Sequence, residues 1–227
     1  MSFRDRAEAG RQLAAALDAY RARRPFVLAI PRGGVVTGYE VAVALGAPLD
    51  VIVPRKLRAP HNPELAIGAV AHDGSVYLDA DLVRSLRVGE DYVREEIANQ
   101  LAEIRRRMQL YRGDQPAPRL VGRVAVVVDD GIATAATMLA AIRAARAMTP
   151  ARLVAAVPVA PADGVRRLAL EADDVCCLLT PEFFYAVGQF YDDFNQTIDD
   201  EVVGLLQRRA AEIAGTERQG QQEDRPR

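Results

Sequence analysis

The chain has no tryptophan, two cysteines and a single lysine among its 29 basic residues. The cysteines, Cys176 and Cys177, are adjacent. Neighbouring side chains of a strand point to opposite faces, so these two thiols cannot form an ordinary disulfide. This scarcity excludes a disulfide-built scaffold and a cysteine zinc site. We expect both cysteines to be plain buried thiols.

Long apolar runs and an excess of one charge are also absent. No run reaches the roughly 18–20 residues that span a bilayer, and the N-terminal segment MSFRDRAEAGRQL has no apolar signal core. We therefore expect a cytoplasmic protein without a membrane partner. The 29 Lys and Arg residues nearly balance the 31 Asp and Glu residues, which argues against a broad basic surface for nucleic acid.

The 227 residues, with 50% hydrophobic side chains, are enough to build the core of one globular domain. Short apolar runs alternate with segments of helical periodicity, which predicts an α/β fold with a parallel sheet flanked by helices. The expected strands are 26–30, 49–53, 124–128, 153–157 and 174–179. The expected helices are 5–23, one that ends at Gly46, 90–112, 134–148 and 162–170.

Three other segments do not follow this alternation. Residues 57–65 contain two prolines and no periodicity, which predicts a loop. Residues 66–70 and 76–78 are typical of two short strands, joined by a turn at His72-Asp73-Gly74. Residues 215–227 are polar with few apolar side chains, and we expect them to form a disordered tail.

The segment VVVDDGIATAAT, residues 126–137, carries the clearest functional signal. Asp129 and Asp130 follow a buried strand, and small residues lead directly into the start of a helix. Backbone N–H groups at such a helix start form an anion-binding nest, and threonine hydroxyls add to it. The residues expected in this nest are Ala133, Thr134, Ala135, Ala136 and Thr137.

The two carboxylates narrow the choice of ligand. They would repel a phosphate unless they bind something else, and ribose hydroxyls or a hydrated Mg²⁺ suit them. The alternative is a tight strand-to-helix turn in which the threonines only cap the helix, but capping does not need two adjacent acids. The segment therefore predicts a site for a phosphate and a ribose at the carboxyl edge of the sheet.

The same segment resembles the signature loop of the type I phosphoribosyltransferases, with Ala135 at a position where that loop usually has glycine. The resemblance covers roughly residues 8–205 and is closest to a bacterial subgroup that carries NPELAIGAV, DDGIAT and FYAVGQFYDDF. It implies a type I phosphoribosyltransferase-like fold with a small C-terminal hood at 180–205, in a single domain over 1–214.

The resemblance also implies an activity. Enzymes of this family move the phosphoribosyl group of phosphoribosyl pyrophosphate to a nitrogen acceptor, here expected to be a nucleobase, with Mg²⁺ as cofactor and pyrophosphate as product. Asp129 and Asp130 would hold the ribose hydroxyls and contact the metal only indirectly, through water or ribose. A homodimer is usual in the family and is expected here.

Further site residues follow from the same resemblance. Residues 31–34, Pro-Arg-Gly-Gly, match the family's pyrophosphate loop, in which a non-proline cis peptide is common. Residues 57–75 match the mobile loop that closes over the site, and Lys56 and Glu64 are expected to act in catalysis with the acid pair. The expected pyrophosphate-binding residues are Arg32, Gly33, Gly34, Arg55 and Lys56. The expected polar contributors of the mobile loop are Arg58, His61 and Glu64, although a solvated loop histidine is an equal alternative for His61.

Residues 183–194 hold 6 of the 13 Phe and Tyr residues. Aromatic rings interleaved with polar side chains suit a planar ligand, because ring faces stack on it and polar groups contact its edge. The candidate base-binding residues are Phe184, Tyr185 and Tyr191. A small satellite core or a dimer contact would explain the same cluster equally well, and both alternatives stay open.

Two other functions are compatible with this sequence. A non-catalytic sensor would bind phosphoribosyl pyrophosphate or a nucleotide and act on a partner. A phosphoribosyl-binding hydrolase would use water as the acceptor. Turnover with a panel of bases separates an enzyme from a sensor, and pyrophosphate release without any base identifies the hydrolase.

The single lysine generates a first testable prediction. Because arginine serves elsewhere as the generic cation, Lys56 either marks a position where a compact ammonium is wanted or is a chance survivor, and its place after the second strand favours the first interpretation. Lys56→Ala removes this charge and Lys56→Arg changes its shape, so both should weaken binding of phosphoribosyl pyrophosphate and leave folding intact. Calorimetric titration with Mg²⁺ and a thermal melt measure these effects. Wild-type affinity in both variants would contradict the assignment.

Overall fold

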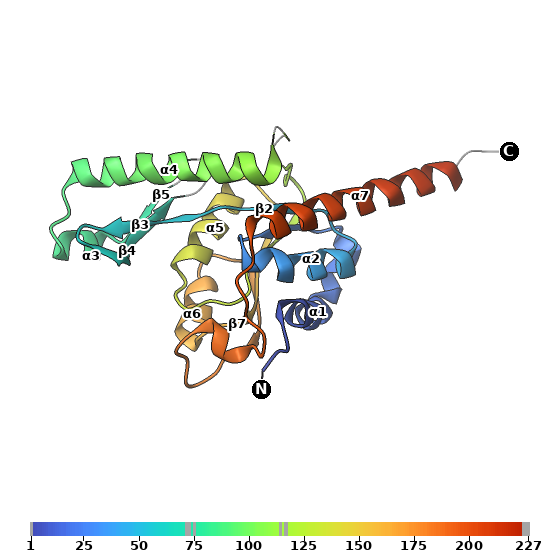
Figure 1. Cartoon of the computed structure of the whole chain (residues 1–227), viewed down its shortest axis with the longest axis horizontal. Coiled ribbons are helices and arrows are strands. Elements are labelled where there is room, and N and C mark those ends of the chain that lie inside the picture. The colour runs from blue at the N-terminus through green and yellow to red at the C-terminus, as the bar shows by residue number, and fades with distance from the viewer. Residues whose placement is uncertain (1, 71–73, 75, 114, 116–117, 224–227) are drawn as a thin grey trace.

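The chain folds around a five-stranded sheet in the order β2–β1–β6–β7–β8 (Figure 1). The computed structural model describes residues 2–70, 74, 76–113, 115 and 118–223. The strands of this sheet are β1 Phe26–Ala29, β2 Leu49–Val51, β6 Val124–Val128, β7 Arg152–Val159 and β8 Asp174–Leu179. All neighbouring pairs are parallel, which confirms the predicted α/β fold.

Helices cover both faces of the central sheet. On one face Val126 packs in a cluster with Leu13 and Val41, and on the other Val127 packs with Met138 and Ile142. Because both faces are buried, a strand here needs a continuous apolar run rather than an alternating one. The helices around the sheet are α1 Arg6–Ala16, a 3-10 helix η1 Asp18–Arg23, α2 Gly33–Leu45, α5 Ala136–Ala147 and α6 Ala162–Leu168. The helix expected at 5–23 is therefore divided in two.

A smaller antiparallel sheet projects from one side of the body together with two helices (Figure 1). Its strands are β3 Arg55–Ala59, β4 Asn62–Val70 and β5 Val76–Leu78, and its helices are α3 Ala80–Ser85 and α4 Glu90–Arg112. We call this assembly the side lobe. The pairing of β4 with β5 confirms the strands expected at 66–70 and 76–78. Residues 72 and 73 of the expected turn lie outside the described residues.

The loop expected at 57–65 is instead a β-hairpin, so that prediction is wrong. Strands β3 and β4 pair around a turn at Pro60-His61, where His61 has a φ of 63°. Leu57 is fully buried and packs in one cluster with Ile104 of α4. The hairpin therefore has hydrophobic partners that are distant in the sequence, and the local pattern does not reveal them. Its movement toward the site stays a prediction.

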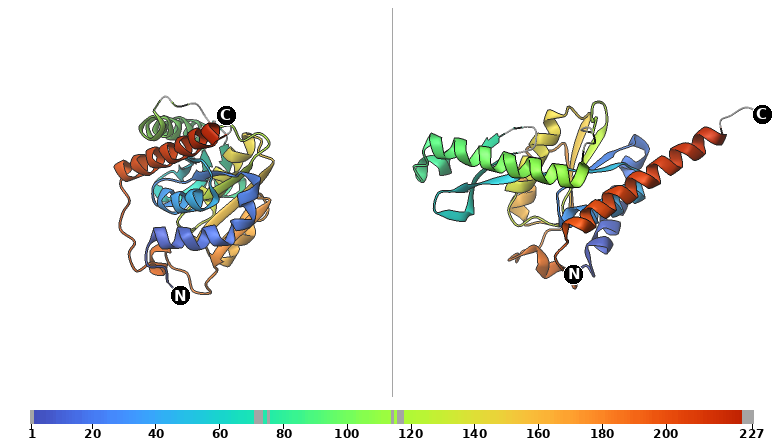
Figure 2. Two further views of the ribbon diagram at one scale, coloured as in Figure 1. Left: turned by 90° about the vertical axis from the view of Figure 1, so that its right-hand side faces the viewer. Right: turned by 45° about the horizontal axis from the view of Figure 1, so that its top comes forward.

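The polar C-terminal segment is helical over its described part. Helix α7 spans Asp199–Glu223, so the disordered tail is a wrong prediction for 215–223, while 224–227 lie outside the described residues. The first half of α7 is anchored on the body, because Val202 is fully buried and Arg209 Nε donates a hydrogen bond to the Ala47 carbonyl over 2.9 Å. The second half extends away from the body (Figure 2).

The two cysteines lie half-buried in β8 and are both free. Cys177 packs against the α5 side of the sheet and Cys176 against the α1–α2 side, as expected for adjacent residues of a strand. In the part of the chain that the structure describes, no helix has both the length and the apolar composition to cross a membrane.

The packing of the hairpin predicts a large effect of one truncation. Leu57→Ala should destabilise the protein by about 2–5 kcal/mol, because it opens a cavity at a fully buried position. Val121→Ala, at a position that is 74% exposed, is the control and should change stability by no more than about 0.5 kcal/mol. Urea unfolding measures both variants. A loss at Leu57 as small as that of the control would show that residues 57–65 do not pack on the side lobe.

Candidate functional site

A cavity of 290 Å³ lies at the carboxyl ends of β1 and β6, which are neighbours in the central sheet. Residues 30–33, which follow β1, and residues 129–134, which follow β6, form most of its wall. This is the edge at which ligands of parallel sheets bind. The sequence-predicted residues that line the cavity are Arg32, Gly33, Lys56, Asp129, Asp130, Ala133, Thr134 and Thr137.

A second cavity of 300 Å³ adjoins the first, and four residues line both: Ile30, Pro31, Lys56 and Thr137. The charged residues that line the second cavity are all cations, namely Arg55, Lys56, Arg58 and Arg107. Burial lowers the pKa of Arg55, and the nearby charge of Arg107 lowers it further. This second cavity, which we call the cationic cavity, therefore favours an anion.

Two helices begin at the first cavity. Helix α5 starts at Ala136, just after the exposed residues Ala133 and Thr134, and α2 starts at Gly33. The first N–H groups of a helix lack intrahelical partners and carry the positive end of its dipole. Both helix starts therefore favour an anion in the cavity. The peptide between Pro31 and Arg32 is cis.

The two aspartates have unequal surroundings. Asp130 Oδ2 accepts a hydrogen bond from Arg6 Nε over 2.6 Å, and the Arg6 and Asp130 side chains are only 12% and 15% exposed. Asp129 Oδ1 accepts a hydrogen bond from the backbone N–H of Asp130 over 2.9 Å. Burial, followed by the charge of Asp130, raises the pKa of Asp129 well above its ordinary value. Asp130 is thus paired directly with a cation, whereas Asp129 is held by a backbone group.

Sequence reasoning missed Arg6. It lies at the first residue of α1, 124 positions before Asp130. Its Nη1 donates to the Asn195 carbonyl over 2.7 Å, and its guanidinium carbon lies 3.8 Å from the ring centre of Phe194. No local motif marks this arginine. The one available signal is that two adjacent acids at the end of a buried strand need a nearby cation.

Gly33 and Gly34 allow the loop after β1 to lie directly against the acid pair. A Cβ atom on Gly33 would overlap Asp130 Oδ2 and lie 2.6 Å from Arg6 Nε. A Cβ atom on Gly34 would lie 2.9 Å from Asp129 Oδ1. Such separations are shorter than van der Waals contact, so the packing itself requires glycine at both positions.

Tyr191 is buried behind the acid pair rather than exposed in the cavity. Its hydroxyl donates to the backbone carbonyl of Asp130 over 2.5 Å, and its ring lies 4.9 Å from Phe194 and 5.4 Å from Phe3. Burial raises the pKa of the Tyr191 phenol, which keeps the hydroxyl protonated as a donor. The residue therefore supports the loop that carries the aspartates.

The other aromatic candidates lie apart from the first cavity. Phe184 packs on Phe190, with ring centres 5.4 Å apart, and Tyr185 is 85% exposed. The C-terminal segment reaches the cavity wall through Val187, in the 3-10 helix η2 Val187–Phe190. The base-binding roles of Phe184, Tyr185 and Tyr191 stay predictions.

The hairpin candidates differ in their placement. Arg58 lines the cationic cavity, whereas His61 is exposed at the hairpin turn and lines neither cavity. Glu64 lies in β4, but its side chain is outside the part that the structure describes. Among the described residues, no group of three or more His, Cys, Asp or Glu side chains could hold a metal ion.

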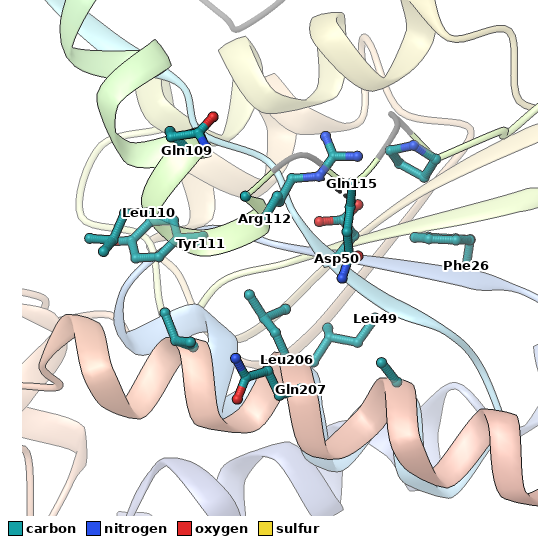
Figure 3. Close-up of a pocket in the computed structure, with 14 residues that line it drawn as sticks. Phe26, Leu49, Asp50, Gln109, Leu110, Tyr111, Arg112, Gln115, Leu206 and Gln207 are labelled. Atoms are coloured by element: carbon teal, nitrogen blue, oxygen red, sulfur yellow. Dashed lines mark ion pairs between the residues drawn. The ribbon is translucent and has the colours of Figure 1, made fainter.

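A cavity of 480 Å³ lies elsewhere, between α4, α7 and the first two strands (Figure 3). Phe26 and Leu49, which line it, are the first residues of β1 and β2. Its charged lining residues, Asp50 and Arg112, form an ion pair at 3.3 Å. This cavity therefore lies at the amino ends of these strands, opposite the first cavity. None of the predicted site residues lines it.

Comparisons with known proteins agree with this arrangement. A family model described as a phosphoribosyl transferase domain matches residues 4–195. Two provisionally named phosphoribosyl transferases of Mycobacterium tuberculosis, from strains CDC 1551 and H37Rv, are each 48% identical over 212 residues. These matches cover 93% of this chain and 48% of each relative, so the chain spans about half the length of the curated relatives.

A solved structure gives the same result at the level of the fold. The crystal structure of TT1426 from Thermus thermophilus is 43% identical in sequence, with a TM-score of 0.79. The superposition covers 91% of this chain and 98% of that one. The similarity therefore extends over the central sheet and the side lobe together.

The different surroundings of Asp129 and Asp130 lead to a prediction about stability. The raised pKa of Asp129 means that the folded state binds its proton more tightly than the unfolded state does, so the contribution of Asp129 to stability falls as the pH rises above about 3.9, the ordinary carboxyl value. Asp129→Asn should therefore stabilise the protein at neutral pH, with a gain that shrinks toward about pH 4. Asp130→Asn should destabilise it, because Arg6 stays buried without its carboxylate. Urea unfolding at both pH values ranks the variants, and the reverse ranking would contradict the described ion pair.

Proposed function

Because this chain belongs to the phosphoribosyltransferase family, we propose that it moves the phosphoribosyl group of phosphoribosyl pyrophosphate to a nitrogen atom of a nucleobase-like acceptor and releases pyrophosphate. One observation supports this most directly: two aspartates, a glycine loop, a helix start and the only lysine meet at one 290 Å³ cavity. Each feature alone is common. Their combination matches a substrate that has a phosphate, a ribose and a diphosphate.

Different residues of the cavity would bind three different parts of this substrate. Backbone N–H groups and threonine hydroxyls over 133–137 would hold the 5′-phosphate. Asp129 and Asp130 would accept hydrogen bonds from the ribose hydroxyls. The loop at 31–34, with Arg55 and Lys56, would hold the diphosphate. The positive charges of the adjoining cationic cavity would then stabilise the departing pyrophosphate.

Positioning and electrostatics would supply most of the rate acceleration. The bond between the anomeric carbon and the pyrophosphate oxygen breaks as the bond from the acceptor nitrogen forms, and positive charge develops on the ribose. Carboxylates held in a fixed, partly buried place stabilise that charge without having to reorient. Asp129 and Asp130 are therefore the proposed catalytic carboxylates of the site, and the charge of Lys56 would stabilise the leaving pyrophosphate.

Mg²⁺ is the proposed cofactor, bound by the diphosphate rather than by a protein cluster. The donor set fits this arrangement, because the described residues contain no group of three metal-ligating side chains and Asp130 Oδ2 is already engaged by Arg6. The aspartates would contact the ion through water or ribose oxygens. When bound, the ion would neutralise part of the diphosphate charge.

The side lobe would provide a movable wall. Lys56 and Arg58 lie on the β3–β4 hairpin, whereas the aspartates follow a strand of the central sheet. Movement of the hairpin toward the sheet would exclude water from the reaction. Glu64, on the same hairpin, is a further proposed catalytic residue.

Release of pyrophosphate tests the proposal. The protein is incubated with phosphoribosyl pyrophosphate, Mg²⁺ and single purine or pyrimidine bases. Release that depends on one base, with formation of the matching nucleotide, supports transfer. Equal release without any base would identify a hydrolase, and binding without release would identify a sensor; either result would contradict the proposal.

The acid pair gives the sharpest prediction of this function. With Mg²⁺ present, Asp129→Asn/Asp130→Asn should lower the affinity for phosphoribosyl pyrophosphate by roughly 10²–10⁴, because each lost hydrogen bond to a charged group is worth about 1.5–3 kcal/mol. Asp192→Asn, at an exposed acid of the C-terminal segment, is the matched control and should bind normally. Isothermal titration calorimetry compares the three proteins. Tight binding by the double variant would refute the ribose assignment.

A further inference from the structure

We propose that Arg6 is a positioning residue of the ribose subsite, which holds the Asp130 carboxylate in the orientation that accepts a ribose hydroxyl. The inference rests on the proposed function and adds to it a residue from the opposite end of the domain. Arg6 itself does not line the 290 Å³ cavity, whereas Asp130 does. Its effect on a ligand would therefore pass through Asp130.

The Arg6 side chain is fixed on three sides. Its Nε donates to Asp130 Oδ2 over 2.6 Å, its Nη1 donates to the Asn195 carbonyl over 2.7 Å, and its guanidinium carbon lies 3.8 Å from the Phe194 ring centre. Only 12% of the side chain is exposed. A planar guanidinium can donate from two separate nitrogens while its flat face lies on a ring, whereas a lysine ammonium has one nitrogen and no planar face.

The Asp130 carboxylate is confined from the other side by the glycine loop. A Cβ atom on Gly33 would overlap Asp130 Oδ2 and lie 2.6 Å from Arg6 Nε, so the glycine backbone packs directly against the ion pair. With Oδ2 held in this way, the carboxylate cannot rotate without breaking the ion pair. Oδ1 is then the oxygen expected to serve the ribose.

The anchors of Arg6 come from a segment that also holds the backbone of Asp130. The backbone N–H of Phe3 donates to Phe190, and that of Asp192 donates to Phe3, each over 2.8 Å. The hydroxyl of Tyr191 donates to the Asp130 carbonyl over 2.5 Å. The N-terminal segment and residues 190–195 therefore form one unit around Asp130, which gives this part of the aromatic motif a supporting role.

A paired acid buried for stability alone would not need to face a cavity. Asp130 does face one, next to Asp129 and close to Ala133 and Thr134, which precede α5. Arg6 supplies a positive charge directly beside this acid pair, from behind the cavity wall. The arrangement keeps a carboxylate available as an acceptor while limiting the repulsion from its neighbour.

The test compares two ligands that differ only in the groups Asp130 would bind. Ribose 5-phosphate and 2,3-dideoxyribose 5-phosphate share the phosphate, but the second has no hydroxyls for the acid pair. Calorimetry measures both affinities in the wild type, Arg6→Gln, Arg6→Lys and the control Arg11→Gln, whose side chain is 49% exposed on the same helix. The wild type and control should prefer ribose 5-phosphate.

We expect Arg6→Gln to lose about tenfold or more in affinity for ribose 5-phosphate, the equivalent of one hydrogen bond to a charged group. Its affinity for the dideoxy ligand should stay within about twofold of the wild type. Arg6→Lys should recover part of the preference, because it keeps the charge but loses the fork. Phe194→Leu keeps Arg6 but removes the ring on which it stacks, a ring that also packs against Tyr191. It should show the same selective loss and keeps the test valid if Arg6→Gln fails to fold.

Three outcomes would overturn the inference. Unchanged preference in both Arg6→Gln and Phe194→Leu would show that Arg6 does not act on the ribose subsite, while the proposed function stands. An equal loss for both ligands would show that Arg6 only stabilises the fold. A wild type that does not distinguish the ligands would refute the ribose site itself, and with it both proposals.

Discussion

The close contact between the loop after β1 and the acid pair after β6 is the constraint on which the candidate site depends. The two strands lie side by side in parallel register, with Ala29 opposite Val128. Their following loops consequently meet, and only glycine at positions 33 and 34 leaves room for the carboxylates. The same contact sets where α2 begins, where Asp130 meets Arg6 and where the cavity opens.

Charge is separated across the two adjoining cavities. Both carboxylates line the first cavity, together with Arg32, whereas all the charged residues that line the second are cations, and Lys56 lines both. Such a gradient favours a ligand that donates hydrogen bonds at one end and carries negative charge at the other. The near-zero net charge of the whole chain conceals this local polarity. Composition alone therefore excludes a broad basic surface but says nothing about a small charged site.

The sequence predicts those features that local pattern determines. The central sheet follows from continuous apolar runs such as VAVVV, and the acid pair and helix start follow from the segment at 126–137. The errors arise where distant contacts decide the structure. Leu57 becomes part of a hairpin because Ile104 covers it, and α7 persists because its first half is anchored at Ala47. The role of Arg6 could not be predicted for the same reason, since its partners Asp130 and Asn195 are distant in the sequence.

The pairing of the N-terminal segment with residues 190–195 determines when the site can be completed during synthesis. A ribosome produces the glycine loop and both aspartates well before Phe194 and Asn195, and until then the guanidinium of Arg6 lacks two of its three contacts. A nascent chain that ends before this point can form the sheet from β1 to β8 while its acid pair lacks a fixed cation. The proposed ribose subsite would therefore be among the last parts of the domain to mature.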